Sequence, residues 1–358
     1  MEDNPYKHLA ERLDALPNGF PLTDDGVELR LLAKIFTPEE AALTAQLRLT
    51  WETPAQIADR IGGDPEGLSK QLKGMARKGL ITAGRTDEGL GYGLMPFAFG
   101  IYEMQMSRMD AEMARLFEDY YLKVFGQVIT MEPSIHRVIP VGKSVRMDIE
   151  VRPFESAADI VNRAQAWGVL DCICRKQKAL IGEPCEHPVD ICMVFNQRPG
   201  AFDRSSTIKA VTHEESMATL RRAAEAGLVH SVSNNQQGMS YICNCCTCSC
   251  AVLRGMADLG MANVIARSDF VNQVDEELCV GCDLCLEHCQ FGSLSLDGVV
   301  HVNETRCVGC GVCVSFCPEG ALSLVRRPAE EIMPPPVTEA DWRVERAAAR
   351  GQDLNEVL

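Results

Sequence analysis

The stretch Cys279-Val-Gly-Cys282-Asp-Leu-Cys285-Leu-Glu-His-Cys289 recurs, with changes, as Cys307-Val-Gly-Cys310-Gly-Val-Cys313-Val-Ser-Phe-Cys317. Each reads C-x2-C-x2-C-x3-C, the thiolate spacing that holds a [4Fe–4S] cluster. The first three cysteines, on a tight loop, point their sulfurs at three corners of one cube, whereas the fourth, at the start of a helix, faces the other cube. The expected ligand sets are Cys279, Cys282, Cys285 and Cys317 for one cluster, and Cys307, Cys310, Cys313 and Cys289 for the other.

The region from about Val274 to Arg326 resembles a bacterial two-cluster ferredoxin. Its halves share Cys-Val-Gly-Cys and end in similar tails, which begin at Gly292 and Gly320. Such an internal repeat indicates a pseudo-twofold arrangement of two clusters. One difference from the family is Gln290, which stands after the fourth cysteine where a proline is usual. The alternative is a pair of zinc ribbons, but zinc sites usually use two separated C-x2-C pairs.

Composition restricts the remaining possibilities. The 358 residues suggest two or three domains, and the net charge of −15 argues against a large nucleic-acid footprint. An acidic surface suits docking on a basic redox partner. The 17 cysteines are spaced too closely for separate bridges and are read as metal ligands. Without a recognisable export signal or a membrane-spanning apolar run, the sequence predicts a cytoplasmic protein of anaerobic or microaerobic metabolism.

Residues 1–25 are expected to form an N-terminal arm with one short amphipathic helix. Residues 26–96 resemble a winged helix: a helix, a helix–turn–helix and a hairpin. Three helix starts are marked by a capping residue followed by proline, at Thr37-Pro38, Thr53-Pro54 and Asp64-Pro65. Two short strands are expected at 80–83 and 91–94, around a polar tip.

The winged-helix resemblance leaves two functions open. The helix from Pro65 carries basic residues, which favour DNA binding: Lys70, Lys73, Arg77 and Lys78. They lie late in the helix, however, whereas base-reading side chains usually lie near its start, and Glu66 stands there instead. Winged helices also serve as dimerisation or docking modules. Residues 97–126 are predicted as a long connecting helix, whose methionine-rich apolar stripe is read as core or dimer interface rather than a soft-metal face.

Residues 127–270 are predicted to be a cysteine-rich α+β domain, with two strands in 135–151 and a helix over 156–167. The Gly142-Lys143-Ser144 sequence invites a P-loop interpretation. The first glycine of that motif should stand at position 137, which is arginine, so nucleotide binding there is rejected.

This middle domain carries nine further cysteines: Cys172, Cys174, Cys185, Cys192, Cys243, Cys245, Cys246, Cys248 and Cys250. Thiolates so close together need a cation, which indicates one or two further Fe–S clusters or, alternatively, structural zinc. One division assigns the first four to one centre and four of the last five to another, with a surplus thiol left for an unusual cluster. Arg175 and Lys176 are expected beside this anionic site. The possible histidine ligands are His187, His213 and His230.

Residues 271–327 are expected to form the ferredoxin-type domain, and 328–358 a proline-rich linker and tail with a helix near 339–350. The sequence therefore predicts an α+β multidomain protein. The whole chain resembles bacterial 4Fe-4S-binding proteins that join a winged helix, a cysteine-rich middle of the CxCR…CNCC kind and a ferredoxin. That resemblance implies no particular activity.

We expect an electron-transfer protein with a partner oxidoreductase, and a homodimer through the winged helix or the long helix is possible. The alternatives are a redox- or iron-responsive winged-helix transcription regulator, and an oxidoreductase or reductive activase that uses an unusual cluster in the middle domain. No catalytic residue is assigned.

Overall fold

The computed structural model describes residues 4–205, 207–257, 260–261 and 264–358. The chain forms two compact units. The first comprises Met1–Val128, Leu180–Gly182 and Arg343–Leu358, and the second comprises Ile129–Ala179 and Glu183–Trp342. No helix among the described residues is long and apolar enough to cross a membrane.

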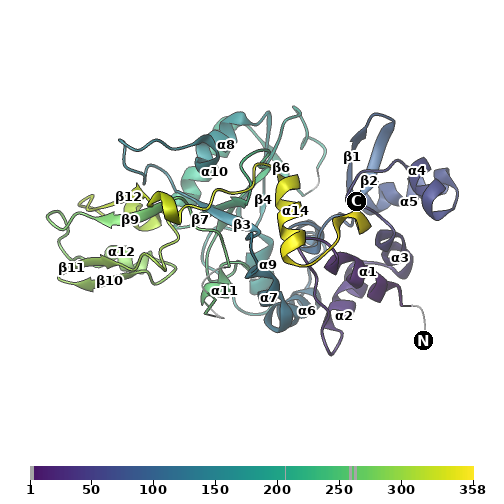
Figure 1. Cartoon of the computed structure of the whole chain (residues 1–358), viewed down its shortest axis with the longest axis horizontal. Helices are drawn as coiled ribbons and strands as arrows, with labels where there is room; N and C mark the ends of the chain where they lie inside the picture. Colours follow the sequence, from purple (N-terminus) through teal and green to yellow (C-terminus); the bar gives the residue numbers. More distant parts are fainter. Residues whose placement is uncertain (1–3, 206, 258–259, 262–263) are drawn as a thin grey trace. The chain divides into compact units, whose positions relative to one another are not determined.

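The first unit is a group of helices followed by a hairpin (Figure 1). Its elements are α1 (Pro5–Asp14), α2 (Val27–Ile35), α3 (Pro38–Ala45), α4 (Pro54–Ile61), α5 (Pro65–Arg77), β1 (Thr82–Thr86) and β2 (Gly89–Gly93). The three predicted starts of α3, α4 and α5 are confirmed. Thr37 and Thr53 form reciprocal capping boxes, and the Asp64 carboxylate accepts from the Gly67 amide.

Residues 4–20, which the sequence predicts as an N-terminal arm with one helix, pack into the core of this unit. Helix α1 packs against α2 and α3, and Leu9, Leu13 and Phe20 are buried. The hairpin is also longer than expected, because the strands pair through Gly84 and Gly91 and leave a turn of only two residues.

The predicted long helix over 97–126 is broken. It consists of η1 (Phe97–Ile101), η2 (Glu103–Gln105), α6 (Ala111–Tyr120), η3 (Tyr121–Phe125) and the start of α7 (Gly126–Ile129). Two features interrupt it: Gly100 has a non-helical backbone, and Asp110 caps a new helix by accepting from the Met113 amide. Met109 and Met113 are buried, as a core stripe requires, whereas Met104 is exposed.

The C-terminal helix α14 (Glu339–Ala349) ends in the first unit, where Arg346 is fully buried. Its guanidinium donates to the carbonyl oxygens of Pro17 and Val128. Arg350 donates to the Asp14 carboxylate at 2.8 Å. The tail is therefore tied to the helical unit by two arginines, Arg346 on buried backbone carbonyls and Arg350 on a carboxylate.

The second unit is built on a six-stranded antiparallel sheet of order β3-β7-β8-β5-β4-β6 (Figure 1). The strands are β3 (His136–Ile139), β4 (Ala166–Asp171), β5 (Asp190–Asn196), β6 (Lys209–Val211), β7 (Val229–Ser233) and β8 (Tyr241–Cys245). Helices α8 (Ala157–Arg163) and α10 (His213–Glu225) pack together, and their apolar residues share one core with Met193, Phe195 and Ile242. The remaining helices of this part are η4 (Pro153–Glu155), α9 (Ile173–Leu180) and α11 (Arg254–Ala257).

Two predictions for this region were wrong. Only one strand, β3, forms within 135–151, and the chain beyond it makes a single bridge from Val145 to Leu324. Helix α8 stops at Arg163 because Trp167 belongs to β4, where it pairs with Phe195. The strand pairing of Trp167 therefore decides its conformation, although its spacing in the sequence fits the helix.

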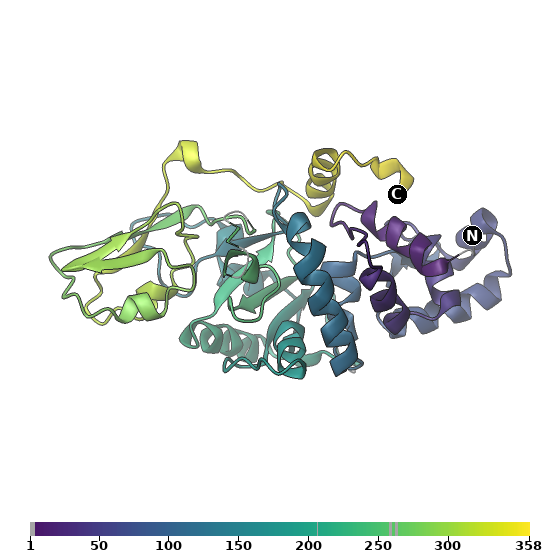
Figure 2. The same ribbon diagram turned by 90° about the horizontal axis from the view of Figure 1, so that it is seen from below.

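The ferredoxin-type region contains two antiparallel strand pairs and two short helices (Figure 2). β9 (Phe270–Val274) pairs with β12 (Leu322–Arg326), and β10 (Leu294–Asp297) pairs with β11 (Val299–Val302). Helices α12 (Leu284–Glu287) and α13 (Val312–Ser315) pack on each other, and η5 (Ala329–Glu331) follows. The last short helix, η6 (Leu354–Glu356), lies in the first unit.

The proline-rich segment after this region is not a free spacer. The Gln236 and Gln237 amides donate to the carbonyl oxygens of Pro336 and Val337, each at 3.0 Å. The Gln236 side chain also donates to Pro335 O at 2.7 Å. The segment is therefore held along the loop between β7 and β8.

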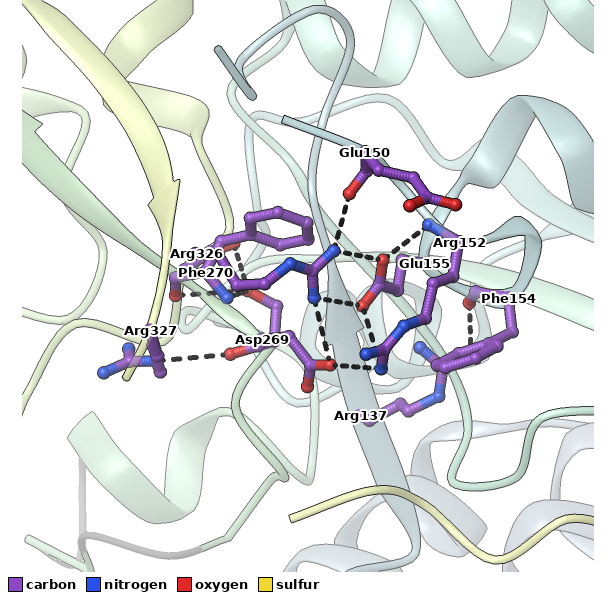
Figure 3. A network of polar contacts seen from close by, with 11 residues as sticks. Arg137, Glu150, Arg152, Phe154, Glu155, Asp269, Phe270, Arg326 and Arg327 are labelled. Atoms are coloured by element: carbon purple, nitrogen blue, oxygen red, sulfur yellow. Dashed lines mark hydrogen bonds and ion pairs between the residues drawn. The ribbon is translucent and has the colours of Figure 1, made fainter. Parts of the chain in front are cut away.

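An ion network of two buried carboxylates and two partly exposed arginines fixes the β9–β12 pair to the segment before α8 (Figure 3). Arg326 donates to both carboxylate oxygens of Glu155, at 2.9 and 3.0 Å, and to Glu150 O at 2.6 Å. Arg152 and Arg326 each lie 3.4 Å from the Asp269 carboxylate. Burial, reinforced by Glu155, raises the pKa of Asp269 to about 6.

Arg346→Ala should destabilise the first unit. The substitution leaves the buried carbonyl oxygens of Pro17 and Val128 without their donor, so we expect the free energy of unfolding to fall by roughly 2–4 kcal/mol. Urea denaturation measures this change. Glu345→Ala, on the exposed face of the same helix, is the control and should change stability by less than about 0.5 kcal/mol. Equal effects of the two substitutions would contradict the role of Arg346.

Candidate metal centres

The first ferredoxin-type motif, Cys279 to Cys289, brings together the thiols expected for one cluster. Cys279, Cys282 and Cys285 line a hollow together with Cys317 from the second motif. Gly281 adopts a positive φ of 67° between the first two cysteines, and a Cβ there would lie 2.5 Å from Gly298 O. Only glycine lets the loop approach β10–β11 so closely. Burial, with the other three thiols nearby, raises the pKa of Cys285 to about 11.

The second motif, Cys307 to Cys317, repeats this arrangement. Burial raises the pKa of Cys310 to about 12, and the neighbouring thiols that add to this are Cys307 and Cys289. Cys313 lies in the same electrostatic environment, and the Asn272 amide donates to its sulfur at 3.3 Å. The structure therefore lines one hollow with Cys279, Cys282, Cys285 and Cys317, and it places Cys289 near enough to Cys310 and Cys313 to affect their charge. The crossed ligand sets stay a prediction.

The two motifs differ in exposure. Cys282 is exposed, and the apolar side chains around it reach solvent, with Val280 67% and Leu278 48% exposed. In the second motif Cys307 and Cys313 are buried. The first motif therefore presents the outward face of this region.

In the middle domain, three cysteines and one histidine converge: Cys185, His187, Cys246 and Cys248. We call them the four-ligand site. Their sulfur and ring-nitrogen atoms all lie within 4.8 Å of one another. The Sγ–Sγ distances are 3.0 Å for Cys246–Cys248, 3.1 Å for Cys185–Cys248 and 3.6 Å for Cys185–Cys246. His187 Nδ1 lies 3.1 Å from the Cys185 sulfur and 3.8 Å from that of Cys248.

The other six cysteines of the middle domain form a second group, the six-thiol group: Cys172, Cys174, Cys192, Cys243, Cys245 and Cys250. Cys172 lies close enough to Cys174 and Cys192, and Cys250 close enough to Cys174 and Cys245, for these thiols to shift one another's pKa. Hydrogen bonds from Cys174 and Cys192 lower the pKa of Cys172 well below its usual range, although burial opposes them. Among the described residues, these thiols form no group of three within 4.8 Å of one another.

Strand geometry explains why these six thiols meet. Cys243 and Cys245 alternate along β8 with Ile242 and Asn244, so both point to the face opposite the α8–α10 core. Cys192 has the same orientation on β5, between the core residues Ile191 and Met193. The other three thiols reach the same face from the ends of elements. Cys172 follows β4, Cys174 lies in the first turn of α9, and Cys250 follows β8.

Arg175 is associated with both groups. Its side chain is only 2% exposed, and it donates to Pro188 O at 3.0 Å, to Asn244 O at 3.1 Å and to Cys246 Sγ at 3.3 Å. Burial alone disfavours its charge, but the thiolates of Cys172 and Cys246 outweigh burial and raise the pKa of Arg175. A hydrogen bond from Cys248, with help from His187 and Arg175, lowers the pKa of Cys246 to about 3.

Gln290 connects the ferredoxin-type region to the middle domain. Its side-chain Oε1 accepts from the Thr247 amide at 2.8 Å, and its Nε2 donates to Gly227 O at 2.6 Å. Thr247 stands between two residues of the four-ligand site, and Gln290 follows Cys289. A proline at this position could make neither bond, so the departure from the ferredoxin pattern has a structural reason.

The sequence-based division of the nine thiols differs from the structure. Cys185 does not join Cys172, Cys174 and Cys192 but lies with Cys246 and Cys248. Arg175 is beside the thiols as predicted, whereas Lys176 is half-buried on the same helix.

Of the three candidate histidines, only His187 lies among the thiols. His213 contacts Asn162 Oδ1 at 2.7 Å, and His230 contacts Asn244 Oδ1 at 2.6 Å. The signal that could have singled out His187 is its Cys-x-His spacing with Cys185, which matches the Cys-x-Cys spacing of Cys246 and Cys248.

The basic residues of α5 are exposed on the first unit. Lys70, Lys73 and Arg77 face solvent, while Lys78 pairs with Glu40 at 2.6 Å. DNA binding by this helix stays a prediction.

Comparison with known proteins identifies the cysteine motifs. The family model for a 4Fe-4S binding domain matches residues 272–295 and 300–323, which contain the two ferredoxin-type repeats. The chain thus carries two tandem 4Fe-4S-binding motifs. The match leaves the rest of the chain unassigned. Neither the search of the curated proteins nor that of the solved structures found a match.

Asn272→Leu should lower the reduction potential of the cluster at the second motif. A hydrogen bond to sulfur favours the reduced, more negative cluster, and losing one of about 1 kcal/mol corresponds to roughly 40 mV. A redox titration followed by electron paramagnetic resonance measures the shift. Gln273→Leu, exposed on the same strand, is the control. Equal potentials in wild type and Asn272→Leu would contradict the role of this amide.

Proposed function

We propose that this chain is an iron–sulfur electron-transfer protein that exchanges electrons with a partner redox protein at its first motif and passes them between its ferredoxin-type region and its middle domain. The ligand sets are those that the spacing predicts: Cys279, Cys282, Cys285 and Cys317 for one cluster, and Cys307, Cys310, Cys313 and Cys289 for the other. When bound, the clusters supply one-electron redox chemistry. The main support for this proposal is the pair of hydrogen bonds made by the Gln290 side chain. Gln290 follows the predicted cluster ligand Cys289, and these bonds connect it to the cysteine-rich loop of the middle domain.

The path from the proposed second cluster to the middle domain runs through its ligand Cys289 and is short. Cys289 accepts from the Ser293 amide at 3.3 Å, which holds its sulfur in place. The next residue, Gln290, reaches Thr247 through a single hydrogen bond. His288 stacks on Phe316 with ring centroids 3.4 Å apart, which also fixes this part of the loop.

The six-thiol group is proposed to hold a further Fe–S centre. Its thiols are more widely spread than those of the four-ligand site, which suits a cluster better than a single ion. The group lies under a buried cation, Arg175, that offsets thiolate charge. Hydrogen bonds and positive charge near sulfur raise the reduction potential, so this environment favours electron flow toward the middle domain.

The surface of the first motif fits a docking site. Exposed apolar side chains surround Cys282, namely Leu278, Val280, Leu284 and Leu296. The charged residues among them are acidic and exposed: Asp275, Glu276, Glu277, Asp283, Glu287 and Asp297. An apolar centre with an acidic rim is complementary to a partner whose own apolar patch carries lysine and arginine at its edge.

The test of the function is an anaerobic redox titration of the full chain with iron and sulfide counted before and after. The proposal requires reversible reduction and reoxidation with the iron retained. Loss of iron on a single reduction and reoxidation cycle would overturn it.

Gln290→Pro should loosen the bridge without removing the clusters. Losing the bond to Thr247, worth about 1.4 kcal/mol, is expected to speed hydrogen exchange of the Thr247 amide by about tenfold. Mass spectrometry of peptides covering 243–250 measures the exchange, and flash reduction followed by freeze-quench spectroscopy should show slower transfer into the middle domain. Glu287→Ala, on α12 and exposed, is the control. Unchanged exchange and transfer would contradict the role of the bridge.

Glu277→Lys should slow reduction of a basic acceptor protein. Removing attraction at the docking rim is expected to lower the second-order rate roughly threefold to tenfold at low ionic strength and to weaken its salt dependence. Stopped-flow measurement with a small basic cytochrome gives both quantities. Glu345→Lys makes the same charge change in the first unit and should leave the rate nearly unchanged. An equal effect of both variants would show that net charge, rather than this surface, sets the rate.

A further inference from the structure

We infer that the four-ligand site binds a single zinc ion, distinct from every Fe–S centre of the chain, and that this ion holds the loop before β5 to the loop after β8. The inference goes beyond electron transfer, because the site is closed and redox-inert. It rests on four side chains from two segments: Cys185 and His187 from one, and Cys246 and Cys248 from the other.

The first argument is distance. Zinc–sulfur bonds of about 2.3 Å at tetrahedral angles put the sulfurs about 3.8 Å apart. The three sulfurs of the site lie 3.0–3.6 Å apart, and His187 Nδ1 lies 3.1 and 3.8 Å from two of them. Four such donors enclose a volume that fits one ion, since a cube would have to place four irons and four sulfides between them.

The second argument is a comparison within the chain. The cysteines of the two ferredoxin-type motifs also converge, yet among the described residues they form no group of three with ligand atoms within 4.8 Å of one another. Thiols arranged for a cluster are therefore spread more widely in this same structure. The ligand atoms of the four-ligand site lie closer together than the thiols of the ferredoxin-type motifs do, as expected for one ion rather than a cluster.

The third argument is ligand chemistry and charge. Three thiolates with one imidazole form a closed tetrahedral set that is typical of structural zinc. Three thiolates and Zn²⁺ carry a net charge of −1, which the buried Arg175 offsets. Its guanidinium donates to Cys246 Sγ at 3.3 Å, as expected for a group that supports a metal ligand from behind.

The proposed consequence is mechanical. The residues between α9 and β5 include exposed Glu183, Pro184 and Glu186, so this loop has little apolar packing of its own. A zinc ion would join it to the loop that also receives the Gln290 bond through Thr247. The cysteine-rich face of the sheet would then keep its shape whether or not the clusters are loaded.

The test is a count of zinc, iron and sulfide on the full chain, purified without oxygen from cells supplied with both metals. Wild type should hold about one zinc per chain. His187→Ala and Cys248→Ser should lose most of it while iron and sulfide stay within error of wild type. His187→Cys restores four ligands and should retain zinc, which separates metal loss from misfolding. His213→Ala, with an exposed histidine outside the site, should change nothing.

Three results would overturn the inference: wild type without zinc, zinc retained in both His187→Ala and Cys248→Ser, or iron lost in parallel with zinc in these variants. Cobalt substitution gives a second readout, because a tetrahedral thiolate site colours the protein and His187→Ala should remove that absorption. None of these results depends on whether the clusters cycle reversibly, so the zinc inference and the electron-transfer proposal fail separately.

Discussion

The buried guanidinium of Arg175 satisfies the main electrostatic constraint of the middle domain. Nine thiols lie close together on and beside one sheet, and a thiolate in such surroundings is stable only with a cation next to it. Arg175 touches Cys246 directly and stabilises the thiolates of both thiol groups. Its two backbone acceptors, Pro188 O and Asn244 O, belong to the two segments that also carry the ligands. The Arg175 side chain therefore joins the loop before β5 to strand β8 and offsets the negative charge of the thiolates.

Asn244 links the Arg175 contact to the opposite face of the sheet, because its backbone carbonyl accepts from Arg175 while its side chain makes hydrogen bonds on the core side. Its Nδ2 donates to Ile191 O at 2.6 Å, and its Oδ1 lies 2.6 Å from His230 Nδ1. Burial lowers the pKa of His230 to about 4, so the ring is neutral and donates this bond through Nδ1. Because Asn244 fills the core side of β8, Cys243 and Cys245 point to the other side. The polar core and the position of the thiols thus depend on each other.

The features that the sequence could predict are those with a local cause. Thr37 and Thr53 start helices through bonds that span three residues, and the two 4Fe-4S-binding motifs follow from the cysteine spacing within each run. The division of the middle-domain thiols has no local cause. Cys185 and Cys246 are 61 residues apart and meet because β5 and β8 are neighbours in the sheet. Neighbours in sequence, such as Cys245 and Cys246, fall into different groups because β8 ends between them.

Non-local pairing also explains the misplaced elements. Trp167 fits the helical pattern of α8, but it pairs with Phe195 in the sheet and donates its Nε1 to Val161 O at 2.8 Å. The residues after β3 carry a strand-like pattern, yet they turn toward the second motif, where Val141 donates to Cys310 O at 2.9 Å. In both cases a long-range partner, which a sequence window does not contain, decides the conformation.

The arrangement of the centres suggests a division of tasks within one unit. The first motif has an exposed apolar and acidic surface, whereas Cys307 and Cys313 of the second motif are buried. Gln290, which follows Cys289, contacts the middle domain. Between that bridge and the six-thiol group stand Cys246 and Cys248, part of the closed site. If electrons change the charge of the neighbouring clusters, a zinc ion at this position keeps its own charge and geometry. The loop that links the redox centres would then not move with their oxidation state, which is the condition for fast transfer with little reorganisation.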